Sequence, residues 1–296
     1  MNAKHKLLLD TDIGGDLDDA LALAYLLRQP RCELLGVTTV GGEAEKRAAL
    51  ASAICKAAGR ADMPIHVGAS APILLDEKQP VAQQAEALSE QWPHLTFGLR
   101  NTAIGFLADT IRAYPHQITL LTIGPLTNIG LLFALEPDVV PLLAGMMVMG
   151  GSLLAESAHD EWNIYCDPHA AAKVFGSGLP LISVGVDVTG PCRLEREDFY
   201  RRLRHLGGPF DFVCAMAEVF FRDTDAVVFH DPYAAALIFE PALCATRSMR
   251  LEVELYDKAH LGRTRAVAEA ADRPHRVAFG GDPEAFFEHY FAVAQA

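Results

Sequence analysis

Five aspartates lie within ten residues near the start of the chain. They are Asp10, Asp12, Asp16, Asp18 and Asp19. Carboxylates this close raise one another's pKa unless a positive charge lies among them. The stretch contains no Lys or Arg, and a helix N-terminus supplies only about half a charge. We therefore predict a bound cation, and oxygen-only ligands favour a hard ion such as Ca²⁺ or Mg²⁺.

The flanking elements place these aspartates in a loop. Residues 7–9 are three leucines that predict a buried strand, and residues 21–27 predict a mostly buried helix. At the end of that strand, Asp10 and Asp12 point to the same face. An EF-hand is excluded, because its bidentate Glu position falls on Leu21.

Ordinary helix capping is the structural alternative to a cation site. Asp16 would be the N-cap, and Asp18 and Asp19 would be favourable charges in the first helical turn. This alternative accounts for one or two of the aspartates, but it leaves Asp10 and Asp12 unexplained. A phosphate-binding loop is disfavoured, since five carboxylates repel a phosphate.

Composition restricts the partners of this chain. The 296 residues are 51% hydrophobic and 21% charged, with a formal net charge of -13. Such a chain has a sizeable core, and its negative charge argues against nucleic acid or an anionic membrane as the main partner. A neutral, nucleoside-sized ligand remains compatible with this charge.

Cysteine usage and hydropathy predict a cytoplasmic protein. The six cysteines are scattered without a C-x-x-C pair, which favours buried free thiols in a reducing compartment. The leucines before Asp10 are too few for a signal peptide. Two uncharged runs, 117–135 and 139–155, contain Gly and Pro and are typical of strand–loop–helix units rather than membrane spans.

Strand and helix patterns alternate along the chain. Strands are predicted at 32–40, 64–68, 118–123, 145–149 and 181–186, and helices at 44–58, 102–114, 126–135, 167–175, 195–205, 210–221, 233–238 and 283–294. Residues 250–279 predict strands in a hairpin-like pattern, and 70–100 a long loop of the kind that often forms a lid. We therefore predict one α/β domain, 1–296, with an open, mainly parallel sheet and helices on both faces. Its ligand is expected beyond the carboxyl ends of the strands.

The motifs resemble those of the nucleoside hydrolases, the calcium-dependent N-ribohydrolases. The N-terminal signature is Asp10-Thr11-Asp12 followed by Gly14 and Asp18-Asp19-Ala20-Leu21. Further blocks match in order along the chain: Val37-Thr38-Thr39-Val40, Ile123-Gly124-Pro125-Leu126-Thr127-Asn128, Met149-Gly150-Gly151, Glu161-Trp162-Asn163-Ile164, Asp187-Val188-Thr189 and His230-Asp231-Pro232. The resemblance implies a Rossmann-like nucleoside hydrolase architecture, a role in nucleoside salvage, and a homodimer or homotetramer.

The resemblance also implies a Ca²⁺ site. Its ligands would be the carboxylates of Asp12, Asp19 and Asp231 and the main-chain carbonyl of Ile123. Asp12 would in addition be the base that takes a proton from a water bound to the ion. His230, next to Asp231, would be the acid that protonates the departing base, since an imidazole titrates near neutrality; its alternative role is to orient or cap a helix start.

Ribose contacts follow from the same resemblance. Asp18, Glu161 and Asn163 match residues that contact ribose hydroxyls, and Trp162 lies between two of them. Anionic groups suit this reaction, because cleavage of an N-glycosidic bond passes through a positively charged, oxocarbenium-like ribosyl group. The structural alternative for Glu161 is a surface acid.

Three departures from the family pattern affect these assignments. The aspartate loop has two extra residues, Gly15 and Asp16 or their equivalents, so Asp16 could take a ligand position. Glu43 follows two glycines where many members have an Asn that contacts ribose, and we expect Glu43 to take that role. Ala155 lies near the place of another expected Asn, which removes one contact to the 5′ side of the sugar.

Two other functions are compatible with parts of the pattern. One is a homologue that binds a metal and a nucleoside without turnover. The other is an aspartyl-phosphate phosphohydrolase, which Asp10-Thr11-Asp12 resembles superficially. That class requires Thr or Val where this chain has Gly14. Ribonucleoside hydrolysis is therefore the leading prediction.

Overall fold

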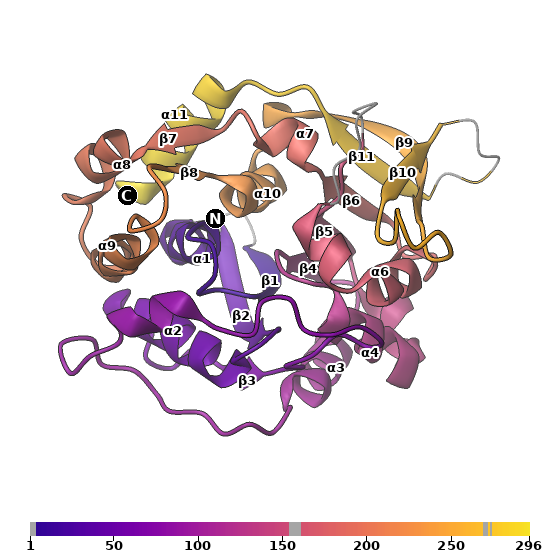
Figure 1. Ribbon diagram of the computed structural model, residues 1–296, viewed down its shortest axis with the longest axis horizontal. Coiled ribbons are helices and arrows are strands. Elements are labelled where there is room, and N and C mark those ends of the chain that lie inside the picture. The colour runs from indigo at the N-terminus through magenta and orange to yellow at the C-terminus, as the bar shows by residue number, and fades with distance from the viewer. Residues whose placement is uncertain (1–3, 154–160, 269–271, 273) are drawn as a thin grey trace.

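The computed structural model describes residues 4–153, 161–268, 272 and 274–296 and is built on a nine-stranded sheet (Figure 1). The strand order is β10-β9-β11-β6-β5-β4-β1-β2-β3. The strands are β1 His5–Thr11, β2 Cys32–Thr39, β3 Ile65–Val67, β4 Ile118–Thr122, β5 Gly145–Met149, β6 Leu181–Val184, β9 Ala245–Val253, β10 Thr264–Val267 and β11 His275–Phe279. All neighbours from β11 to β3 pair in parallel, whereas β9 is antiparallel to both β11 and β10. The predicted mainly parallel sheet is confirmed.

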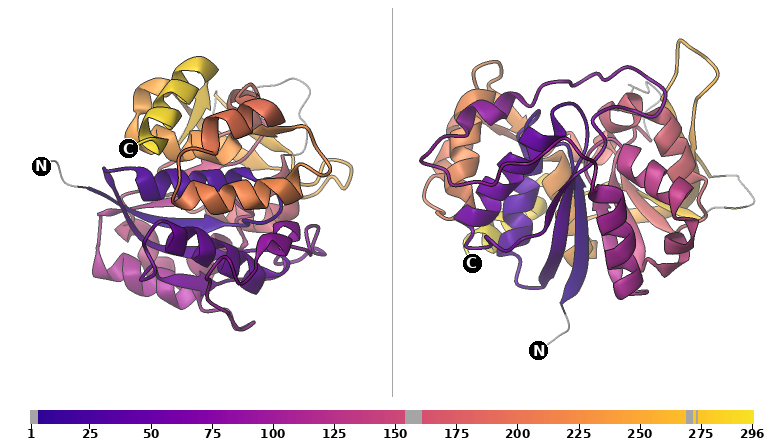
Figure 2. Two further views of the ribbon diagram at one scale, coloured as in Figure 1. Left: turned by 90° about the vertical axis from the view of Figure 1, so that its left-hand side faces the viewer. Right: turned by 90° about the horizontal axis from the view of Figure 1, so that it is seen from below.

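Helices cover both faces of this sheet (Figure 2). They are α1 Asp18–Arg28, α2 Ala44–Ala57, α3 Ala103–Ala113, α4 Thr127–Leu135, α5 Trp162–Cys166, α6 Pro168–Phe175, α7 Val186–Thr189, α8 Arg196–Leu203, α9 Pro209–Phe220, α10 His230–Phe239 and α11 Pro283–Ala294. Side chains of β1 alternate between two cores. Leu7 and Leu9 pack in the cluster that contains α1 and α10, and Leu8 packs in the one that contains α3, α4 and α6.

β1 lies where the direction of strand addition reverses. The chain adds β2 and β3 on one side of β1 and then returns to add β4, β5 and β6 on the other. Ligands of open α/β sheets bind beyond the carboxyl ends of the strands at such a point. The aspartate loop, which follows β1 directly, therefore lies at the position that the topology favours for a site.

The structure differs from the sequence-based expectation in its smaller elements. Residues 185 and 186 leave the predicted strand, and Asp187 lies in the short helix α7 that follows β6. β7 Arg193–Glu195 and β8 Ala226–Val228 form a second, two-stranded sheet that was not predicted. Both strands have three residues, which is too short for a recognisable alternation.

The long segment between β3 and α3 has little regular structure, as predicted. It contains one 3₁₀ turn, η1 Gln83–Ala87; two further turns, η2 Pro137–Leu142 and η3 Pro241–Leu243, lie elsewhere. In Figure 1 the part of the segment that follows η1 is the purple trace that runs along the lower margin from beside α2 to α3. Within the described residues, no helix has the length and hydropathy of a membrane span.

Candidate active site

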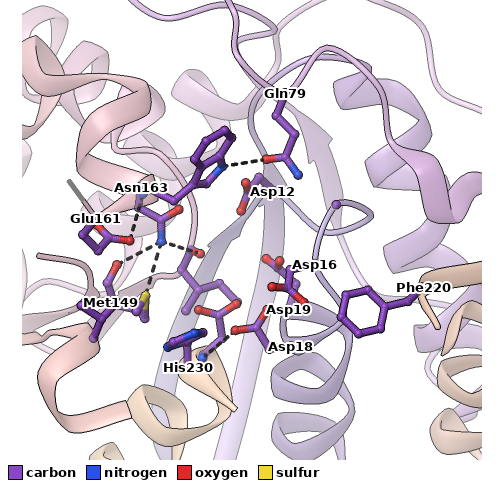
Figure 3. A pocket seen from close by; sticks show the side chains of 15 residues that line it. Asp12, Asp16, Asp18, Asp19, Gln79, Met149, Glu161, Asn163, Phe220 and His230 are labelled. Carbon is purple, nitrogen blue, oxygen red and sulfur yellow. Dashed lines mark hydrogen bonds between the residues drawn. The ribbon is translucent and has the colours of Figure 1, made fainter. Parts of the chain in front are cut away.

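A cavity of about 430 Å³ opens at the carboxyl ends of the central strands (Figure 3). It is lined by Asp12, Gly15, Asp16, Asp18, Asp19, Gln79, Ile123, Met149, Glu161, Trp162, Asn163, Val186, Phe220, His230 and Asp231. The volume lies in the range of small-molecule sites. Each predicted site residue except Glu43 lines this cavity.

Three buried carboxylates form a group that could hold a cation. Asp18, Asp19 and Asp231 each offer an oxygen, and these oxygens lie within 4.8 Å of one another. Asp18 and Asp19 come from the first turn of α1 and Asp231 from the first turn of α10. The structure thus adds Asp18 to the predicted ligand set, while Asp12 and the carbonyl of Ile123 line the same cavity.

Burial makes these carboxylates costly to ionise without a cation. Desolvation raises the pKa of Asp18, Asp19 and Asp231 well above the ordinary value, and repulsion by the neighbouring carboxylates adds to the shift. Desolvation also raises the pKa of Asp12 to about 6, although the charge of Arg47 opposes the shift. Uncompensated negative charge of this kind fits a divalent cation.

Two helix N-termini meet at the carboxylate group. The main-chain N–H of Asp231 donates to the Asp18 carboxylate over 3.3 Å, which joins the starts of α1 and α10. Each N-terminus contributes a partial positive charge that stabilises nearby anions. Capping by Asp16 is not observed: Leu17 is the N-cap of α1, and Asp16 accepts only from the main-chain N–H of Leu17 among the described contacts.

Asp10 supports the site from beneath. One of its oxygens accepts hydrogen bonds from Thr38 and, over 2.7 Å, from the side-chain amide of Asn128. Asn128 also donates to the carbonyl of Thr39 and accepts from the N–H of Ala69. Asp10 does not line the cavity, and its hydrogen bonds tie β1 to Thr38 on β2 and to Asn128 on α4.

Glu161 and Asn163 are held by main-chain groups. Glu161 is the N-cap of α5 and accepts from the N–H groups of Gly151, Asn163 and Ile164 over 2.9–3.1 Å. Desolvation raises its pKa, although these three bonds oppose the shift. The amide of Asn163 donates to the carbonyl of Ile123 over 3.1 Å, so two predicted site residues are directly connected.

His230 lies at the start of α10 in the cavity wall. Its Nδ1 is 2.6 Å from the hydroxyl of Thr189. Burial lowers the pKa of His230 to about 4, so the imidazole is neutral at pH 7. Its helix-start position also matches the structural alternative considered for this residue.

Glu43 is not brought to the cavity. Its carboxylate pairs with Lys46 one helical turn away and accepts from the N–H of Ala82 over 3.2 Å. The residue is tied to the long segment rather than to the ligand space. Ala155, near the expected asparagine position, lies outside the described residues.

Several lining residues were missed by sequence reasoning. Gln79 comes from the irregular segment, where no periodicity marks a functional side chain, and its amide oxygen accepts from the indole N–H of Trp162 over 3.2 Å. Phe220, at the end of α9, also lines the cavity, and as one apolar residue of a helix it carries no sign of this role in the sequence. Arg47 on α2 was also missed; its guanidinium lies against the main chain of Asp12 and adds one positive charge beside the aspartate loop, which leaves the carboxylate charge largely uncompensated.

Comparisons with known proteins identify the family of this chain. The sequence model of the family described as inosine-uridine preferring nucleoside hydrolase matches residues 7–288. The pyrimidine-specific ribonucleoside hydrolase RihA of Escherichia coli strain SMS-3-5 / SECEC is 30% identical over 273 residues, which cover 87% of each chain.

Solved structures give the same result. The purine-preferring ribonucleoside hydrolase from Gardnerella vaginalis superposes with a TM-score of 0.84 at 25% identity and covers 98% of this chain and 99% of its own. The inosine-uridine preferring nucleoside hydrolase from Bacillus anthracis, with a TM-score of 0.79, 23% identity and coverage of 98% and 99%, shares the fold. With a family match that runs from β1 into α11, this chain belongs to the nucleoside hydrolases, which cleave the N-glycosidic bond of ribonucleosides, and neither the phosphohydrolase nor the non-catalytic alternative is favoured.

Proposed function

We propose that the carboxylate-lined cavity is the active site in which a ribonucleoside is hydrolysed to ribose and free base. The observation that carries this proposal is the convergence of carboxylates from the β1–α1 loop and from α10 on one cavity. A developing positive charge on the ribosyl group is stabilised by anionic groups placed around it in advance. The buried aspartates supply that environment.

Asp12 is the proposed general base. Its carboxylate lines the cavity, and its raised pKa of about 6 places proton uptake near neutral pH. The position of the side chain is fixed by its neighbours, because a Cβ on Gly124 would lie 2.7 Å from Oδ1 of Asp12 and 2.8 Å from its main-chain nitrogen.

The cation we propose is Ca²⁺, held by Asp12, Asp19, Asp231 and the carbonyl of Ile123. Asp18 is a further candidate ligand, supported by its place in the group of oxygens within 4.8 Å. A bound divalent cation lowers the pKa of a nearby water and orients ribose hydroxyls. The all-oxygen donor set supports a hard ion.

Substrate contacts are assigned to Asp18, Glu161, Trp162 and Asn163, all of which line the cavity. His230 remains the proposed group that assists departure of the base. Its pKa of about 4 keeps the imidazole neutral at pH 7. It would therefore donate a hydrogen bond to the departing base, or relay a proton to it, as a neutral ring rather than as an imidazolium ion that is protonated before the substrate binds.

Three further properties are proposed for the whole chain. Residues 1–296 form one domain, which the shared nine-stranded sheet supports. A cytoplasmic location is supported by six free cysteines. A homodimer or homotetramer is supported by exposed apolar side chains on the long segment, namely Ile73, Leu74, Val81, Leu95 and Leu99.

Release of ribose tests the proposed reaction. The protein is incubated with inosine, adenosine, uridine and cytidine, with Ca²⁺ or with a chelator, and reducing sugar is measured. Both base classes are included because relatives carry pyrimidine-specific and purine-preferring names. We expect ribose from at least one nucleoside and its loss with the chelator. No ribose from any of them would contradict the proposal, and phosphate release from a phosphomonoester would favour the phosphohydrolase.

A further inference from the structure

Arg47 is a fully buried cation next to the candidate active site. It lies on α2, and none of its surface is exposed. Its guanidinium donates to four main-chain carbonyls: those of Gly41 over 2.9 Å, Asp12, Ile13 over 3.2 Å and Gln79 over 3.0 Å. Among the described residues, no carboxylate lies within ion-pair distance of Arg47.

A buried charge that binds only carbonyls requires an explanation. Burial of an ion is costly unless good partners surround it. Carbonyl dipoles satisfy the five N–H groups of arginine well, because the planar guanidinium presents them in fixed directions. The nearby carboxylates contribute at longer range, since Arg47 lowers the pKa of both Asp12 and Asp19.

The four carbonyls belong to three separate segments. Asp12 and Ile13 lie in the β1–α1 loop, which carries the carboxylates, and Gly41 lies in the turn between β2 and α2. Gln79 lies in the long segment between β3 and α3. One side chain therefore joins the cation side of the cavity to the segment that covers it.

Gln79 passes this connection to the cavity mouth. Its side-chain oxygen accepts from the indole N–H of Trp162 over 3.2 Å (Figure 3). Close packing fixes its main chain, because a Cβ on Gly42 would overlap the carbonyl oxygen of Gln79, and its side chain covers Gly15 so closely that a Cβ there would overlap it too. The hydrogen bond between Gln79 and Trp162 therefore connects the lining of the cavity to the main-chain segment that Arg47 holds in place.

We propose that Arg47 is a positioning residue that couples the aspartate loop to the segment around Gln79. The positions of the cation ligands and of the part of the long segment that lines the cavity would then depend on the same side chain. This inference rests on the proposed function. It predicts that loss of the guanidinium weakens both cation binding and substrate binding, although Arg47 touches neither.

The sign of the change in cation affinity separates positioning from simple charge. If Arg47 acted only through its positive charge, its removal would strengthen cation binding to the nearby carboxylates. If it positions the loop, its removal weakens cation binding. We expect Arg47→Met to lower the Ca²⁺ affinity, measured by calorimetry without substrate, by at least about 10-fold, and to raise KM by a similar factor with a smaller change in kcat.

Two further variants make the test decisive. Arg47→Lys keeps the charge but loses the planar guanidinium. We therefore expect most of the loss of Ca²⁺ affinity and most of the rise in KM seen in Arg47→Met. Lys46→Met removes a charge from the next position of α2, where the side chain is exposed, and we expect wild-type Ca²⁺ affinity and KM. Wild-type behaviour of Arg47→Lys, or tighter Ca²⁺ binding by folded Arg47→Met, would overturn the proposal.

Hydrogen exchange gives a readout that needs neither turnover nor a cation. The N–H of Gln84 donates to the carbonyl of Gly14 over 3.0 Å and so reports contact between the long segment and the aspartate loop. We expect faster exchange of this amide in Arg47→Lys and in Arg47→Met, but not in Lys46→Met. If the wild type cleaves no nucleoside, calorimetry and exchange still decide the role of Arg47. Unchanged exchange in a folded Arg47 variant would contradict the coupling.

Discussion

At the scale of single residues, the buried aspartates of the cavity reduce the stability of the folded protein when they are ionised. Asp12 is buried, and its pKa is raised from 3.8 to about 6, with desolvation as the largest cause. A carboxyl group with a raised pKa in the folded state destabilises the protein as the pH rises through that range, because the unfolded state ionises first. The loss of unfolding free energy that is due to Asp12 is therefore complete above about pH 6.

Replacement of Asp12 by Asn should separate activity from stability. We expect kcat to fall by about 10²–10⁴, since the proposed general base is lost. In chelator at pH 7, we expect the free energy of unfolding to rise by up to roughly 2–3 kcal/mol, because a buried charge is removed. Nucleoside hydrolysis and urea unfolding measure the two effects. Asp109→Asn, at an exposed position of α3, is the control. Normal turnover by Asp12→Asn would disprove the role of Asp12 as the general base.

Sequence reasoning reached the residues that lie in motifs and missed those that act through the main chain. The cluster of aspartates stood out by type and spacing, whereas Glu161 and His230 were reached through the motifs that resemble the family. Arg47 looks in the sequence like one more charge on an alanine-rich helix, and nothing local shows that its partners are carbonyls of three distant segments. Glu43 is absent from the lining of the cavity, and its position after two glycines does not reveal its pairing with Lys46.

At the scale of elements, a few buried polar side chains hold irregular segments to the regular frame. Asp167 is fully buried between α5 and α6. It caps α6 by accepting from the N–H of Ala170 over 3.0 Å, and it accepts from the N–H of Ile73 and the hydroxyl of Thr127 over 2.8 Å each. One carboxylate thus anchors α6, α4 and the first part of the long segment.

Loss of the Asp167 carboxylate should loosen all three elements. We expect Asp167→Ala to lower the free energy of unfolding by about 2–4 kcal/mol, because a helix cap is lost and buried donors are left without partners. Asp167→Asn keeps one acceptor oxygen and should lose less. Urea denaturation measures both, and a loss below about 1 kcal/mol for the alanine variant would show that water replaces these bonds.

Element types were predictable, whereas their spatial order was not. Apolar runs of five to eight residues, such as β2 and β4, are clear in the sequence, and so is helix α2. The placement of β4 beside β1 follows from tertiary packing, for which the sequence offers no local signal. The three-residue strands β7 and β8 are too short to show periodicity, so they were missed.

At the scale of the whole molecule, buried histidines make stability depend on pH. The ring of His275 accepts from the N–H of Leu251 through Nδ1 and donates to the carbonyl of Phe175 through Nε2, each over 3.0 Å. Protonation of Nδ1 would break the first bond. Burial lowers the pKa of His275 from its ordinary value of 6.5.

His275 should therefore contribute a loss of stability as the pH falls below 6.5, opposite in sign to the contribution of the buried aspartates. The unfolded state takes up the proton in this range while the folded state resists it, and one pKa unit corresponds to about 1.4 kcal/mol. His275→Gln keeps one donor and one acceptor but does not titrate, so we expect its unfolding free energy to rise relative to that of the wild type as the pH falls from 7 to 5. His205→Gln, on the surface, should follow the wild type. Parallel profiles for His275→Gln and the wild type would exclude this contribution.

The bond between Asp18 and Asp231 also has a consequence for the order of events during synthesis. It joins residues 213 positions apart, and β1 is paired on one side by β4, which is made only after residue 117. The aspartate loop therefore leaves the ribosome long before its partners exist. Contacts of such separation form late and slowly. A nascent or truncated chain that ends before α10 should contain the whole N-terminal signature and yet have no ion affinity and no turnover.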